Sequence, residues 1–180
     1  MQSLRMLLAL SILTGLVYPV AMTGLAQVLF PEEANGSLIW VDDKRIGSEL
    51  VGQAFSSDRH FWPRPSATGY NPLPSAGTNA GPTNAALRDS VQSRAARFMS
   101  PVSAIPADLL LASGSGLDPH ISPEAARFQI DRVLVARALA PEHRVDLERL
   151  VRDYTEPPQF NLLGQYRVNV VRLNMALDSL

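Results

Sequence analysis

The stretch Met6–Pro31, MLLALSILTGLVYPVAMTGLAQVLFP, contains no charged residue across its 26 positions. Arg5 directly precedes it, and Glu32 and Glu33 directly follow it. Because an α-helix rises about 1.5 Å per residue, roughly 20 residues cross a bilayer core of about 30 Å. The stretch therefore predicts a single transmembrane helix over 6–31, with all of the following chain on one side of a membrane.

A cleaved signal peptide is the competing interpretation of the same stretch. Gly24 and Ala26 satisfy a small-x-small cleavage pattern after an apolar segment. Apolar residues resume at 28–30, past that site, and keep the stretch at membrane-spanning length, which favours a retained anchor. Both interpretations place the remaining chain outside the cytoplasm.

The charges at the two ends of the helix predict its orientation. Arg5 and the initial amino group lie on the N-terminal side, whereas Lys44 and Arg45 follow the helix only at some distance. Cytoplasmic flanks of membrane helices carry the excess of Lys and Arg. We therefore expect a cytoplasmic N-terminus and an extracytoplasmic domain over 32–180.

One face of the predicted membrane helix is a candidate surface for docking another helix. At about 100° per residue, five side chains share this face: Ser11, Thr14, Gly15, Tyr18 and Met22. The small pair at positions 11 and 15 lets helix backbones approach closely, and Pro19 is expected to kink the helix beside it. Small residues are also frequent in membrane helices without any such role.

The composition excludes several classes of function. The chain has 180 residues, with 16 Lys and Arg against 17 Asp and Glu, which is not the basic balance of a nucleic-acid-binding protein. It contains no cysteine, so disulfides, thiolate metal sites and thiol nucleophiles are absent. The length beyond residue 31 suits one domain with its own core.

The soluble part predicts a mixed α+β domain. Strands are expected at 37–41 and 45–55, joined by a hairpin tip at Asp42-Asp43-Lys44. Helices are expected at 84–99, 123–138 and 141–154, with Ser122 and Pro123 starting the second. The run 109–112 reads as a strand, although so short a run does not exclude a helix. A last strand is expected at 168–173, with Asn174 capping a short terminal helix.

The segment 62–83 is rich in proline and glycine, which excludes regular helix or strand. Arg64 is its only charged residue, and Phe61, Trp62 and Tyr70 flank it or lie within it. Two interpretations stay open: a flexible linker, or an ordered surface loop that docks another surface.

The stretch 113–123, SGSGLDPHISP, holds the residue types of a hydrolytic triad in Ser115, Asp118 and His120. The members of a triad usually come from separate elements, so three within six positions more often cap and satisfy one another. The stretch also lacks a Walker ending and a Gly-x-Ser-x-Gly pattern. We therefore expect a structural or docking loop that includes Arg64, and keep a membrane-anchored periplasmic hydrolase as the alternative.

No other chemistry is evident in the sequence. His60, His120 and His143 lie on different segments without the spacing of metal ligands, so no metal site is predicted. Gln129, Arg132 and Arg137 read as ordinary exposed positions of a helix.

Several stretches carry a resemblance to a known family. They include SELVGQAF at 48–55, FWPRPSA at 61–67, YNP at 70–72, SGSGLDPHISP at 113–123 and VNV at 168–170. With them the chain closely resembles, over essentially its whole length, the C subunit of the bacterial Kdp potassium-transporting ATPase. It departs at 75–79, where the family more often shows a second glycine and a serine.

The resemblance implies a subunit with one transmembrane helix and no catalytic residues of its own. Its implied partners are a channel-like potassium-translocating subunit, a P-type ATPase catalytic subunit and a small membrane subunit, within the lipid bilayer. The complex handles ATP and potassium, and no cofactor is implied for this chain. The C subunit is thought to stabilise assembly and has been proposed to raise the ATP affinity of the catalytic subunit as a catalytic chaperone. An extracytoplasmic domain would exert such an effect only allosterically.

Overall fold

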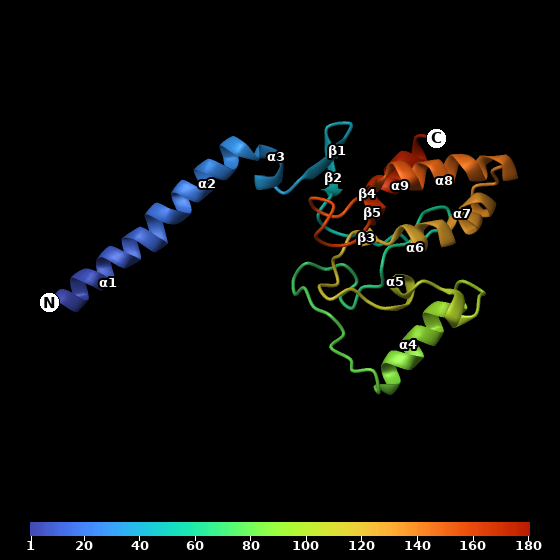
Figure 1. The fold of residues 1–180 in the computed structure, drawn as a ribbon, viewed down its shortest axis with the longest axis horizontal. Coiled ribbons are helices and arrows are strands. Elements are labelled where there is room, and N and C mark those ends of the chain that lie inside the picture. Colours follow the sequence, from blue (N-terminus) through green and yellow to red (C-terminus); the bar gives the residue numbers. More distant parts are fainter. The chain divides into compact units, whose positions relative to one another are not determined.

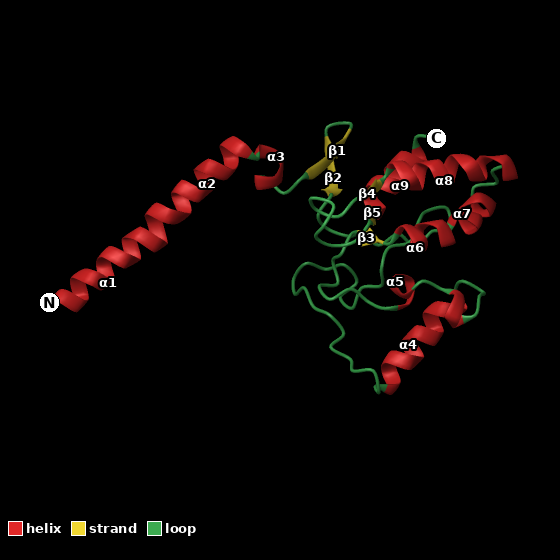
Figure 2. Cartoon of the chain, in the orientation of Figure 1, coloured by secondary structure: helices red, strands yellow, loops and turns green.

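A computed structural model describes residues 1–180, apart from the side chain of Ser103. The chain divides into two compact units, Met1–Ser48 and Glu49–Leu180. Figure 1 follows the order of the elements along the chain, and Figure 2 separates helices from strands and loops. Helices and small sheets both occur, so the expected α+β class is confirmed.

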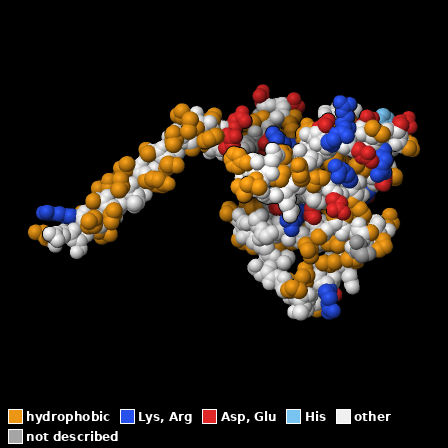
Figure 3. Space-filling view, in the orientation of Figure 1, with side chains coloured by type: hydrophobic (Ala, Val, Ile, Leu, Met, Phe, Trp, Pro, Cys, Tyr) orange, Lys and Arg blue, Asp and Glu red, His pale blue; other side chains and the backbone are white. Residues whose placement is uncertain are grey.

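The first unit begins with one continuous helix over Gln2–Leu29, made of α1 (Gln2–Ile12), the π-helical turn η1 (Leu13–Val17) and α2 (Tyr18–Leu29). Its mean hydropathy of 1.9 and its 28 residues make it long and apolar enough to cross a membrane. Figure 3 shows hydrophobic side chains along its whole length. The π turn ends at Val17, two residues before Pro19. Because proline has no N–H, it removes one backbone hydrogen bond of the helix at the place where the sequence predicts a kink.

A short helix, α3 (Pro31–Ala34), and a two-stranded hairpin complete this unit. β1 (Leu38–Val41) pairs antiparallel with β2 (Lys44–Ser48), and Asp42 and Asp43 form the tip with φ of 48° and 60°. Two left-handed residues in a two-residue tip match the twist of the strands. A hairpin was predicted correctly, but Lys44, expected in the tip, already pairs with Val41 in β2, and the strand expected over 45–55 ends at Ser48.

The second unit contains a three-stranded antiparallel sheet in the order β3 (His120–Ile121), β5 (Arg167–Asn169) and β4 (Thr155–Glu156). Its other elements are short helices: α4 (Ala85–Ala96), η2 (Val102–Ala104), α5 (Ala107–Leu110), α6 (Pro123–Phe128), α7 (Ile130–Ala136), η3 (Pro141–His143), α8 (Arg144–Asp153) and α9 (Val170–Asp178). The predicted cap at Ser122 is correct, since its hydroxyl accepts from the Ala125 amide, and Asn84 caps α4 by accepting from the Ala86 amide.

One hydrophobic core joins these elements. Ile130 and Val133 of α7, Val168 of β5 and Leu173 of α9 are fully buried in it. On α8 the apolar pattern of the sequence predicts that Val145 is buried. In the structure Val145 is 69% exposed, whereas Leu147 is 1% exposed and faces the core. The helix was predicted, but its buried face was partly misassigned.

Two apolar runs that were expected to be strands are helical. The run 109–112 begins inside α5, where Leu109 and Leu110 are buried. In 168–173 the strand ends at Asn169, whose side-chain oxygen accepts from the amides of Val171 and Arg172 and so starts α9. Asn174, expected to be the cap, is instead a buried residue inside this helix. A run of buried apolar residues does not by itself distinguish strand from helix.

The proline-rich segment is an ordered loop without helix or strand. Tyr70 Oη donates to the carbonyl of Arg64 at 2.5 Å, and Ser66 Oγ donates to the carbonyl of Gly116 at 2.7 Å. Phe61 and Trp62 at its start are buried. Of the two interpretations of this segment, the ordered loop is the one that the structure supports.

Candidate functional site

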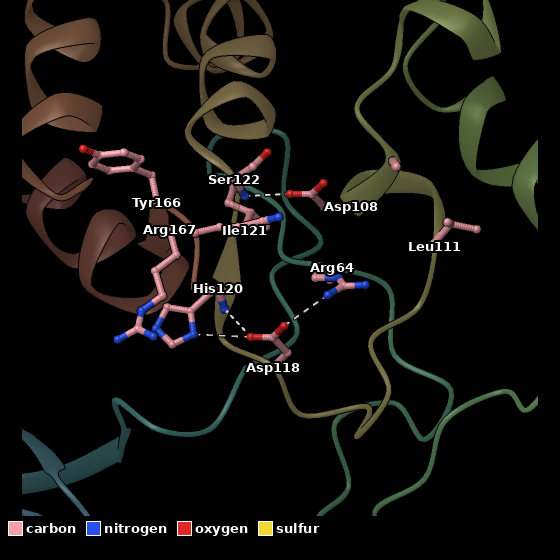
Figure 4. A pocket seen from close by; sticks show the side chains of 11 residues that line it. Arg64, Asp108, Leu111, Asp118, His120, Ile121, Ser122, Tyr166 and Arg167 are labelled. Carbon is pink, nitrogen blue, oxygen red and sulfur yellow. Dashed lines mark hydrogen bonds and ion pairs between the residues drawn. The ribbon is translucent and has the colours of Figure 1, made fainter. Parts of the chain in front are cut away.

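A cavity of about 480 Å³ opens beside the stretch 113–123 (Figure 4). Arg64 from the proline-rich loop, Asp108 from α5 and His120 from β3 line it. Asp118 and Arg167 complete its charged wall. The cavity therefore collects three of the four predicted loop residues, brought together from segments far apart in the sequence.

Asp118 is the centre of this charged wall. Its Oδ2 lies 3.3 Å from Nη1 of Arg64, and its Oδ1 accepts from the amide of His120 at 3.0 Å and lies 3.3 Å from Nδ1 of the same histidine. Burial alone would raise the pKa of Asp118, but the hydrogen bonds from His120 and the charges of His120 and Arg64 outweigh it. The pKa of this carboxyl is therefore lowered, and Asp118 is an anion at neutral pH.

Ser115 does not join this group. It is not among the residues that line the cavity, and its hydroxyl accepts from the amide of Leu117 at 3.1 Å. Its carbonyl accepts from Ser75 Oγ at 2.8 Å. Ser122, which does line the cavity, uses its hydroxyl as a helix cap. The cavity thus offers an acid–base pair and cations, but no aligned serine nucleophile, so its geometry does not favour a Ser-His-Asp hydrolase.

The stretch 113–123 is packed against backbone on several sides. The amide of Gly52 donates to the carbonyl of Leu117 at 2.7 Å, and that of Ser113 donates to Pro65 at 3.0 Å. A Cβ on Gly52 would lie 2.8 Å from the carbonyl oxygen of Asp118, and one on Gly77 would lie 2.7 Å from that of Gly114. Glycine is required where backbones approach this closely. The stretch therefore holds the segments around 52 and 63–77 in place.

Three side chains that the sequence pattern left on the surface are structural. Gln129 is 1% exposed, and its amide both accepts from the N–H of Trp62 and donates to its carbonyl. Arg132 donates to the carbonyls of Asp58 and His60, and Arg137 donates to those of Arg59 and Leu177. The signal for Gln129 was present, because it lies four residues from both Ala125 and Val133 on the buried stripe.

The predicted docking face of the membrane helix is exposed. Ser11 lies in α1, Thr14 and Gly15 lie in η1, and Tyr18 and Met22 lie in α2. Thr14 Oγ1 donates to the carbonyl of Leu10 at 2.7 Å, and nothing lies within 4 Å of a Cβ placed on Gly15. A π turn holds more residues than an α-helical turn, so the spacing of 100° does not apply across η1. The docking face stays a prediction.

Within the described part of the chain, no group of three or more His, Cys, Asp or Glu side chains is arranged to hold a metal ion. The geometry of the second unit is that of a tightly connected domain with a polar cavity.

The family model for the c chain of K+-transporting ATPases, KdpC, matches residues 1–179 of this chain. The chain is 52% identical over 185 residues to the potassium-transporting ATPase KdpC subunit of Methylococcus capsulatus, covering 99% of this chain and 96% of that protein. It is 52% identical to the KdpC subunit of Dechloromonas aromatica, over 94% and 91% of the two chains. Identity to the KdpC subunit of Geobacter sulfurreducens is 50%, over 99% and 96%.

Proposed function

Because the chain belongs to the KdpC family and is thus a component of a potassium uptake ATPase, we propose that it is a non-catalytic accessory subunit that stabilises assembly of the complex. The observation that carries this proposal is that the similarity covers the apolar helix and the second unit together, over residues 1–179. An accessory role also suits a cavity in which no serine is aligned with the Asp118–His120 pair.

The proposed arrangement has helix Gln2–Leu29 crossing the bacterial inner membrane, with the N-terminus in the cytoplasm and the second unit outside. The charge bias supports it, since Arg5 lies near the N-terminal end of the helix, whereas Lys44 and Arg45 follow its other end only at some distance. The proposed partners are the channel-like potassium-translocating subunit, the P-type catalytic subunit and the small membrane subunit.

A cysteine at Asp43 tests this orientation, because the chain has no cysteine and this residue is an exposed hairpin tip. In intact spheroplasts an impermeant maleimide is expected to label Asp43→Cys. A cysteine in place of Ser3, near the other end of the helix, is the matched control and is expected to react only after lysis. The reverse pattern would place the second unit in the cytoplasm.

The proposed arrangement limits how the chain affects ATP hydrolysis. ATP is cytoplasmic, so an extracytoplasmic unit raises the ATP affinity of the catalytic subunit only by coupling through the membrane subunits. The test compares complexes purified with and without this chain, both containing the catalytic subunit. The KM for ATP is expected to be higher in the complex that lacks this chain. An unchanged KM would exclude the effect on ATP affinity, and a remainder that assembles fully without this chain would contradict the role in assembly as well.

A further inference from the structure

A second cavity, of about 260 Å³, lies between the start of the proline-rich loop and the C-terminal half of α4. Its apolar wall contains Phe55, Trp62, Phe98 and Leu109. It is distinct from the cavity around Asp118, since the two share no lining residue. Pockets that enclose a whole small molecule are typically about 300–1,000 Å³, so this volume suits a single large side chain.

Positive charge concentrates at this cavity without a matching negative charge. Arg94, in the last turn of α4, and Arg97, the C-cap residue that directly follows α4, both line it. Among the described residues, neither arginine has a carboxylate oxygen within 4.0 Å. Eight of the eleven other arginines of the second unit do have one, and Arg59, Arg88 and Arg127 are the three others that do not.

A third guanidinium, that of Arg132, shares an aromatic ring with Arg97. Arg97 and Arg132 both stack on the ring of Trp62, at 4.0 Å and 3.8 Å from its centroid. Burial lowers the pKa of Arg132 to about 10, with Asp58 opposing the shift and Arg97 adding to it. Burial also lowers the pKa of Arg94. Bringing an anion to Arg94 and Arg97 would supply the carboxylate partner that neither has among the described residues, whereas Arg132 already has Asp58 4.0 Å from its Nη1.

An exposed apolar residue extends the same surface. Met99 directly follows Phe98 and is 95% exposed, with φ of 49°, a left-handed conformation that is unusual for a residue with a long side chain. Methionine and arginine are both enriched in protein–protein interfaces. The arginine pair, the side-chain-sized cavity and Met99 form one surface, which we call the α4 surface.

We propose that the α4 surface binds an acidic, apolar segment of another subunit of the potassium uptake complex. One large apolar side chain of that segment fills the cavity beside Phe98, and a neighbouring carboxylate lies between Arg94 and Arg97. This inference rests on the proposed role as an accessory subunit, and it specifies a surface and the chemistry of its partner.

Photocrosslinking in the assembled complex tests the inference. A p-benzoylphenylalanine in place of Met99 is expected to crosslink to another subunit, at a segment with Asp or Glu within about four residues of a large apolar residue. The matched control replaces Val145, which is 69% exposed on α8 and lines neither cavity. It is expected not to crosslink to that segment.

Two substitutions at Arg97 separate charge from shape. Arg97→Gln is expected to reduce the crosslink yield from position 99 about tenfold, because it removes a charged contact at the interface. Arg97→Lys keeps the positive charge and is expected to retain most of the wild-type yield. Arg97 is exposed, so both variants should keep the wild-type melting temperature within a few degrees, which separates a binding defect from misfolding.

Three results would overturn the inference while leaving the accessory role intact: no crosslink from position 99 in a complex that contains the chain, a crosslinked segment without acidic residues, or a yield unchanged by Arg97→Gln. Failure of the unmodified chain to co-purify with the other subunits would refute the accessory role itself, and this inference with it.

Discussion

Asn174 and Phe61 form a closed pair of buried hydrogen bonds across 113 residues of sequence. The Phe61 amide donates to Asn174 Oδ1 at 2.8 Å, and Asn174 Nδ2 donates back to the Phe61 carbonyl at 2.9 Å. Phe61 is fully buried and Asn174 is 1% exposed. A side-chain amide in α9 thus satisfies both backbone groups of a residue in a loop that has no secondary structure of its own.

Replacing Asn174 by leucine is expected to destabilise the fold severely. The variant leaves the buried N–H and C=O of Phe61 without partners, at about 1–3 kcal/mol for each group. We therefore expect a loss of about 3 kcal/mol or more in the free energy of unfolding, measured by urea denaturation. Gln92→Leu, on an exposed position of α4, is the matched control and should change it by less than about 0.5 kcal/mol. Equal stability of the two variants would contradict this role of Asn174.

Glycine at position 52 is expected to be required, whereas glycine at 114 is not. A Cβ on Gly52 meets backbone oxygens of Asp118 and Leu117 at 2.8 Å and 3.2 Å, and nothing lies within 4 Å of a Cβ on Gly114. Gly52→Ala should therefore cost about 1–3 kcal/mol of stability, and Gly114→Ala should be nearly neutral. Thermal unfolding of both variants provides the comparison. A sensitive position 114 and a tolerant position 52 would show that the close contact at Gly52 does not constrain the fold.

Asp118 is expected to make the stability of the second unit depend on pH. Its pKa in the folded protein lies below the ordinary value of 3.8, because the hydrogen bonds from His120 and the nearby positive charges outweigh the effect of burial. Its contribution is therefore present above pH 3.8 and is lost as the pH falls through the folded pKa, since the unfolded chain binds the proton first.

The measurement is the difference in urea midpoint between the wild type and Asp118→Asn. At pH 7 the wild type should be more stable by about 1–2 kcal/mol, as for loss of a hydrogen bond to a charged group. The difference should shrink below pH 3.8. Because the pKa of Asp178 is also lowered, the midpoint of the variant will itself fall in acid, so the difference and not the absolute value is diagnostic. A difference that grows in acid would contradict the assignment.

The predicted docking face of the membrane helix gives a test in the complex. Gly15→Leu should block close helix packing and weaken association by about 1–2 kcal/mol, which is roughly tenfold in recovery. Leu16→Phe, one residue along the same helix and away from that face, is the control and should be tolerated. Co-purification with the other subunits in mild detergent is the measurement. Equal recovery of both variants would exclude Gly15 from the interface.

The sequence predicted well those features that depend on local chemistry. The apolar helix, the presence of a hairpin turn at Asp42-Asp43 and the cap at Ser122 each follow from residues adjacent in the chain. The candidate site was predicted in part, since Arg64, Asp118 and His120 share one cavity whereas Ser115 lies outside it.

Features that depend on distant segments were not predictable in the same way. Val170 and Leu173 are helical because Asn169 caps them and α9 packs in the core, and their apolar character is equally compatible with a strand. Arg132 and Arg137 are held by backbone carbonyls more than 70 residues away. A pattern read from one helix does not reveal such partners, because they lie in a loop without periodicity.

The closed pair between Phe61 and Asn174 sets an order of events during biosynthesis. The partner of the loop is made 113 residues after the loop itself. At about 5–20 residues per second, the loop waits on the order of 5–20 s before ribosomes supply α9. During that interval Phe61 lacks its final partner and is open to chaperones and proteases. A nascent chain that stops before α9 would leave Phe61 without that partner permanently, which gives the cell a simple mark by which to recognise and remove an incomplete product.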